Sequence, residues 1–161
     1  MRKRILCIII LLFCANLAFS FDISAYNPVT IDMVDIWIRY YMQENNPGGL
    51  GIFNEPISIR MNVDGFPALL SPSWDRLPIR IFSNAMGFSS QYEDDFFTNT
   101  FGYFVTFQYN NINYILLFQN ELAVSYITNF NINDGVTLYA LFGLFVESNR
   151  EAYIFVNAWS R

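Results

Sequence analysis

The 161-residue chain contains no histidine, two cysteines and one lysine. The cysteines, Cys7 and Cys14, and the lysine, Lys3, all lie within the first 20 residues. From residue 21 onward these absences exclude Ser-His-Asp and Cys-His nucleophiles, Cys/His zinc sites, Schiff-base lysines and the Walker phosphate-binding loop. We therefore expect no enzymatic activity and no cofactor.

The first 20 residues have the pattern of a secretory signal peptide. Three basic side chains within the first four residues precede an apolar run over residues 5–15, and the small residues Ala18 and Ser20 stand at the −3 and −1 positions of a cleavage site. An uncleaved membrane anchor is one competing interpretation, but the apolar stretch over residues 5–21 is interrupted by Asn16 and is shorter than the roughly 20 residues that span a bilayer. A lipoprotein with Cys14 as the lipidated residue is another, but the bulky Phe13 stands where a small residue is expected. We expect residues 1–20 to be a signal peptide and residues 21–161 to be a single exported, β-barrel-like domain.

The expected mature chain is acidic. From residue 21 it carries six arginines and 14 acids, a formal charge of −8. Such a surface repels nucleic acid, so no nucleic-acid partner is expected. Because no cysteine remains, the fold must also be stable without disulfides in an oxidising compartment.

Apolar and polar residues alternate along most of the chain, which is typical of strands with one buried face. Asn110 and Asn111 mark one turn, and Asp134-Gly135 is a hairpin signal. The segment 29–43 fits both a helix capped by Thr30 and a strand, and the sequence leaves this open. The other expected strands cover residues 57–63, 77–83, 101–109, 112–119, 122–130, 136–147 and 152–159.

The polar faces of these strands carry very few charges. Residues 96–146 include only two, Glu121 and Asp134, where average composition predicts about 13. The mature chain also holds 28 aromatic residues in 141, several of them near strand ends, as in the aromatic girdles of membrane barrels.

With the export signal, this pattern resembles the small bacterial outer-membrane β-barrel class. The resemblance implies an all-β, antiparallel up-and-down meander of seven or eight strands closing into a small barrel. Its partner would be the lipid bilayer of the outer membrane. Its role would be structural, adhesive or small-solute binding, because eight strands leave no wide pore.

An alternative stays open, because residues 114–118 and 138–146 are apolar on both faces, as in the core strands of a soluble protein. In that case the chain is a periplasmic or secreted all-β, calycin-like domain that binds an apolar ligand or a protein partner. Thr106→Lys discriminates between the two, since position 106 is wet in the soluble fold and faces a narrow lumen in the barrel.

Two arginines lie within expected strands, each between apolar neighbours. In a barrel, Arg60 and Arg80 would point inward and pair with carboxylates such as Glu121 or Asp64, because an unpaired buried charge is costly. In a soluble sheet they would face water. These charged residues are the candidates for the barrel interior or for a ligand site.

The densest acidic cluster is Glu93, Asp94 and Asp95. Carboxylate oxygens are suitable ligands for Ca²⁺, which makes this cluster the candidate metal site. The competing interpretation, which we favour, is a solvated loop between two strands.

Overall fold

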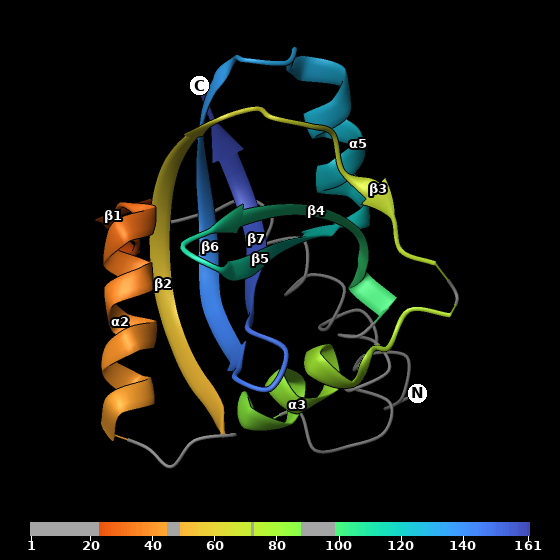
Figure 1. Ribbon diagram of the computed structural model, residues 1–161. Coiled ribbons are helices and arrows are strands. Elements are labelled where there is room, and N and C mark those ends of the chain that lie inside the picture. Colours follow the sequence, from red (N-terminus) through yellow and green to blue (C-terminus); the bar gives the residue numbers. More distant parts are fainter. Residues whose placement is uncertain (1–22, 45–48, 72, 88–98) are drawn as a thin grey trace, which may run out of the picture.

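In a computed structural model, residues 23–44, 49–71, 73–87 and 99–161 are described. They form one seven-stranded mixed sheet with the strand order β1-β2-β6-β7-β5-β4-β3 and three α-helices (Figure 1). The helices are α2 (Ile31–Glu44), α3 (Leu77–Ala85) and α5 (Asn120–Asn129), after a short 3-10 turn, η1 (Ile23–Ala25). The strands are β1 (Asn27–Val29), β2 (Leu50–Asn62), β3 (Ala68–Leu69), β4 (Phe101–Tyr109), β5 (Ile112–Gln119), β6 (Gly135–Val146) and β7 (Glu151–Ser160).

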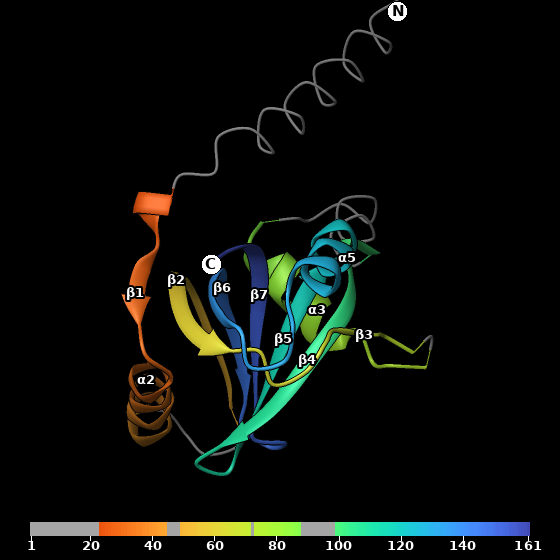
Figure 2. The same ribbon diagram turned by 90° about the horizontal axis from the view of Figure 1, so that it is seen from above.

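The sheet is curved but not closed, so the expected antiparallel barrel is wrong. Two pairs, β1 with β2 and β5 with β7, run parallel, whereas an up-and-down meander has only antiparallel neighbours. The short strands β1 and β3 end the sheet on opposite sides (Figure 2). The physical reason is that three of the eight expected strand segments are helices, and the strands that end the sheet in their place, β1 and β3, have only three and two residues.

The segment that fitted both a helix and a strand is helix α2. The Thr30 hydroxyl accepts a hydrogen bond from the Met33 N–H at 3.3 Å, as expected for a capping residue. Val34 and Ile38, one turn apart, are fully buried, whereas Ile36 is exposed. A helical period therefore separates the buried face of this segment from its wet face.

Helices α3 and α5 replace the strands expected over residues 77–83 and 122–130. In α3, Ile79 and Phe82 are buried at a spacing of three. In α5, Ala123 and Tyr126 are buried at the same spacing. In a segment this short, the apolar residues fit both the helical period of 3.6 residues and the strand period of two. The buried residues are three positions apart, as on one face of a helix. The turn before Gly135 therefore links α5 to β6 and is not a hairpin.

The central strands β5, β6 and β7 are covered on both faces, which explains their continuous apolar runs. One face packs against α2 and α5, and the other against α3. On the α3 face, the Phe82 and Phe155 rings stack with centroids 4.3 Å apart. A Cβ on Gly143 would lie 2.5 Å from the Phe155 ring and 2.8 Å from the Phe82 ring, so only glycine fits there.

The strand expected over residues 101–109 is confirmed as β4, and most of its apolar side chains lie on one face. Tyr103, Val105 and Phe107 pack against the cluster shared with α2 and α5. Phe101 lies instead on the α3 face, because a register shift between Phe101 and Tyr103 inserts an extra residue on β4 opposite β5. The Asn110-Asn111 turn is confirmed, with both residues at positive φ, 48° and 62°.

Candidate functional site

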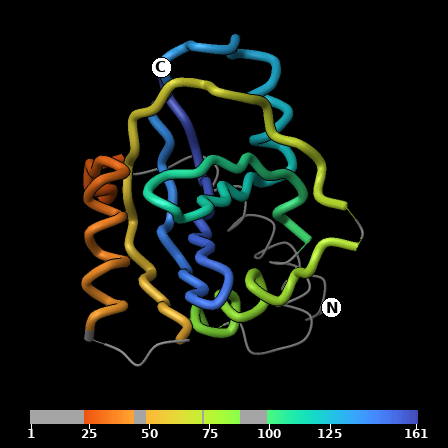
Figure 3. Tube along the Cα trace, viewed as in Figure 1, coloured from red at the N-terminus to blue at the C-terminus, as the bar shows by residue number. Residues whose placement is uncertain are grey.

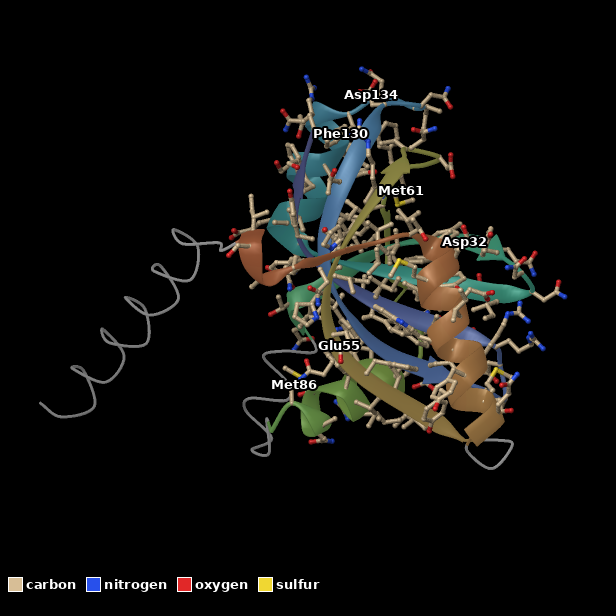
Figure 4. All side chains as sticks on the ribbon, turned by 90° about the vertical axis from the view of Figure 1, so that its left-hand side faces the viewer. Asp32, Glu55, Met61, Met86, Phe130 and Asp134 are labelled. Atoms are coloured by element: carbon tan, nitrogen blue, oxygen red, sulfur yellow. The ribbon has the colours of Figure 1, made fainter. Side chains whose placement is uncertain are left out.

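The sheet curves so far that two distant strands approach each other. Strands β2 and β4 are separated by β6, β7 and β5 in the strand order, yet both line one cavity. Helix α2 also contacts both β2 and the β4–β5 hairpin. We call the gap between β2 and β4 the opening of the sheet. Figure 4 looks toward it, with Asp32 near the start of α2 and Met61 near the end of β2.

Helix α2 fills one half of the opening and is held to the hairpin by polar contacts. The Tyr109 hydroxyl donates a hydrogen bond to the Asp32 carboxylate, and this contact raises the pKa of Tyr109. The Asn110 amide donates to Asp35 Oδ2 at 3.1 Å, and Arg39 Nε lies 2.7 Å from the same oxygen. Because Asp35 is only 4% exposed, this carboxylate is the buried anchor of the contact.

Two polar atoms beneath this contact have no hydrogen-bond partner in the described part of the chain. They are Asp35 Oδ1 and the Tyr114 hydroxyl, both buried. Burial raises the pKa of Tyr114, and the negative charge of Asp35 raises it further. Buried polar groups without a hydrogen bond lower stability. Helix α2 therefore fills this half of the opening, but it leaves two buried polar atoms without a hydrogen bond from the described residues.

The other half of the opening contains the cavity. Its volume is about 90 Å³, several times what one water molecule needs. Asp64, which follows the end of β2, and Thr106, on β4, are exposed at its rim. Figure 3 shows the chain running from the end of β2 across to β3. The lining residues are Met61, Asp64, Gly65, Val105, Thr106, Phe107, Leu116, Phe118 and Tyr126.

Tyr126 is the most buried polar group of the cavity lining, at 3% exposure. Burial, followed by the negative charge of Asp64, raises the pKa of Tyr126 to about 12. Its hydroxyl therefore stays protonated at neutral pH. The cavity combines apolar walls, a neutral phenol and one carboxylate at the rim, which is the composition of a binding site for a small apolar group. A nucleophile activated by a base is not among the lining residues.

The charged residues predicted from the sequence lie apart. Arg60 is on β2, Arg80 on α3 and Glu121 in the first turn of α5, and all three are exposed. Because the sheet is not closed, they have no barrel interior to face. Glu121 lines a wide, shallow depression with Leu69, Tyr103, Asn120 and Val124.

The acidic cluster Glu93, Asp94 and Asp95 lies outside the described residues. Within the described ranges, no three His, Cys, Asp or Glu side chains gather closely enough to hold a metal ion.

Sequence reasoning missed the residues that the opening brings together. Asp64 was considered only as a partner for Arg60, and Asp35 and Tyr126 were not singled out. No local pattern could have identified them, because β2 and β4 approach each other only through the curvature of the whole sheet. The one available signal was helical spacing in 31–44, which places Asp32, Asp35 and Arg39 near one another along the helix.

The chain matches no family model, no curated protein and no solved structure. Among the described helices, none is both long and apolar enough to cross a membrane.

Proposed function

We propose that residues 21–161 form an exported, non-enzymatic binding protein. The ligand inserts an apolar group into the cavity and places a cationic or hydrogen-bond-donating group against Asp64. This keeps the binding role for an apolar ligand or protein partner predicted from the sequence, without the barrel. The observation that carries it is a cavity of about 90 Å³ between packed aromatic strands, with an exposed carboxylate at its rim.

The size and charge of the site limit the ligand. A cavity of this volume suits a branched group of about five carbon atoms, each worth about 0.8 kcal/mol when buried. The resulting total of about 4 kcal/mol corresponds to a Kd of about 1 mM for an isolated fragment. The formal charge of −8 and the position of Asp64 favour a cation over an anion.

Three probes that share one branched five-carbon group test the proposal: 3-methylbutylamine, 3-methylbutanol and 4-methylpentanoate. We would titrate each into the ¹⁵N-labelled mature protein and follow amide chemical shifts. We expect the amine to bind most tightly and the carboxylate least. The shifts should concentrate at Met61, Gly65, Thr106 and Tyr126.

Two matched substitutions locate the binding. Val105→Phe places a ring at the cavity wall and should abolish amine binding, whereas Val124→Phe changes the exposed face of α5 and should preserve it. Asp64→Asn should bring the amine affinity down to that of the alcohol. Amine binding that survives Val105→Phe would refute the cavity as the binding site. Amine binding that is lost only with Val124→Phe would also refute it and would assign the ligand to the shallow depression.

A further inference from the structure

Among the described strands, β4 has a partner along only part of its outer edge. Strand β3 pairs with Phe104 and Tyr103, and the Leu70 N–H donates to the Gly102 carbonyl at 2.8 Å. Beyond Phe104, no described strand lies on this side of β4. By alternation from Gly102, the N–H and C=O groups of Thr106 and Gln108 point away from β5, toward the open side.

Residues 105–108 of this open edge lack the features that protect exposed edges, whereas the Tyr109 side chain at its end contacts α2. Proteins usually blunt them with prolines, charges or bulges. Pro28 lies within the outer strand β1, and Pro67 directly precedes β3. Residues 105–109, Val-Thr-Phe-Gln-Tyr, include neither proline nor charge, and Asn110 follows them. An unprotected edge of this length is a template for another strand.

The open edge and the cavity adjoin. Three consecutive residues of β4, Val105, Thr106 and Phe107, line the cavity. The backbone groups of Thr106, the middle one of the three, point toward the open side. A strand laid along this edge turns every second side chain toward one face. One such side chain would meet the cavity, and a neighbouring residue would lie near Asp64.

We propose that the natural ligand is an extended segment of another protein that adds a strand to β4 along residues 105–109. One aliphatic side chain of the segment enters the cavity, and an adjacent Lys or Arg pairs with Asp64. This inference rests on the proposed function, because it uses the same cavity. Main-chain hydrogen bonds provide affinity, and the cavity and Asp64 select the sequence, as in other cases of strand addition.

Charge favours a basic partner segment over a second copy of this chain. Each copy carries a formal charge of −8 from residue 21 onward and has no lysine there. Pairing two β4 edges would bring two Asp64 side chains toward the same interface, where like charges repel. A basic segment has the opposite charge and avoids this repulsion.

The test uses the mature wild-type protein and the peptide acetyl-Thr-Lys-Leu-Lys-Thr-amide, with binding measured by calorimetry. We expect the peptide to bind about tenfold more tightly than 3-methylbutylamine, because it adds backbone hydrogen bonds. Replacing its Leu by Ala, or both Lys by Glu, should each weaken binding by about tenfold or more.

N-methylation separates strand addition from other modes of binding. In a strand, the Leu N–H and the two Lys N–H groups point to opposite sides. One peptide is methylated at the Leu nitrogen and its matched isomer at both Lys nitrogens. We expect one isomer to lose binding and the other to keep it. Equal loss, or no loss in either isomer, would overturn strand addition.

Substitutions on β4 give an independent readout. Gln108→Pro removes an outward N–H at a residue that does not line the cavity, and Gln108→Ala retains that N–H. The proline variant should lose peptide affinity and keep amine affinity, whereas the alanine variant should keep both. If Gln108→Pro does not fold, the two N-methylated peptides still test whether the peptide binds by adding a strand to β4.

The two proposals fail in different ways. Absence of both amine and peptide binding refutes the cavity as a binding site and, with it, this inference. Amine binding without tighter peptide binding refutes only the strand addition. A stable dimer in sedimentation equilibrium that the peptide does not dissociate would assign the edge to a second copy of the chain and refute the partner proposed here.

Discussion

The two halves of the opening in the sheet have opposite characters. In one half, α2 buries Val34 and Ile38 completely and contacts the hairpin through Asp32 and Asp35. In the other half, apolar side chains of β2, β4 and β5 surround a cavity below the exposed carboxylate of Asp64. The difference teaches that one curved sheet can be completed by a helix at one end and enclose a cavity at the other.

The largest expected effect removes packing from the filled half. Ile38→Ala should lower the free energy of unfolding by about 2–5 kcal/mol, because it truncates a fully buried side chain between α2 and the sheet. Ile36→Ala on the same helix, where the side chain is 60% exposed, should change it by less than about 0.5 kcal/mol. Urea denaturation measures both, and equal values would show that α2 does not pack as described.

Alkaline pH should destabilise the cavity half through Tyr126. Its pKa is about 12 in the folded protein and about 10 in the unfolded chain. The stability due to this shift is complete below pH 10 and is lost as the pH rises toward 12, by about 1.4 kcal/mol per pH unit. Tyr114 and Tyr153, whose pKa values are also raised by burial, should steepen the loss.

Denaturation at successive pH values, with phenolate absorbance recorded in parallel, measures this dependence. Tyr126→Phe should reduce the slope by about 1.4 kcal/mol per pH unit. A slope that is the same in the variant would mean that Tyr126 is not buried in the folded protein.

Two hydroxyl deletions about the α2–hairpin contact should have opposite signs. Tyr109→Phe removes a solvent-exposed donor to Asp32 and should lower the free energy of unfolding slightly. Tyr114→Phe removes a buried hydroxyl that has no partner among the described residues, and should raise it by about 1 kcal/mol. Thermal unfolding at pH 7 compares them. A destabilised Tyr114→Phe protein would reveal a partner for this hydroxyl.

The smallest expected effect is at the rim of the cavity. Thr106 is exposed, so Thr106→Lys should change stability by less than about 0.5 kcal/mol. The adjacent Phe107→Lys places a charge in the aromatic cluster, where the Phe107 ring stacks on Tyr114, and should strongly destabilise the protein. Chemical denaturation of the two variants measures how much the free energy of unfolding changes on each face of β4. A misfolded Thr106→Lys protein would show that position 106 is covered.

The sequence predicted strands β4 to β7 and the Asn110-Asn111 turn, because each follows a local pattern. Tyr114 to Phe118 and the Asn110-Asn111 turn are examples. It failed at α3 and α5, where apolar residues spaced by three also fit an alternating pattern. It failed on closure of the sheet, because the pairing of β5 with β7 depends on contacts between distant segments. The cavity could not be predicted for the same reason, because Met61 and Val105, which both line it, come together only in the folded protein.

The strand order also determines when each part of the chain can fold during synthesis. Strand β2 ends at Asn62, but its antiparallel partner β6 begins only at Gly135, and β5 lacks its parallel neighbour until β7 is made. High contact order of this kind slows folding, and it delays a stable core until the β6–β7 pair exists. With this topology, we expect the central sheet of a nascent chain to form only when synthesis is nearly complete.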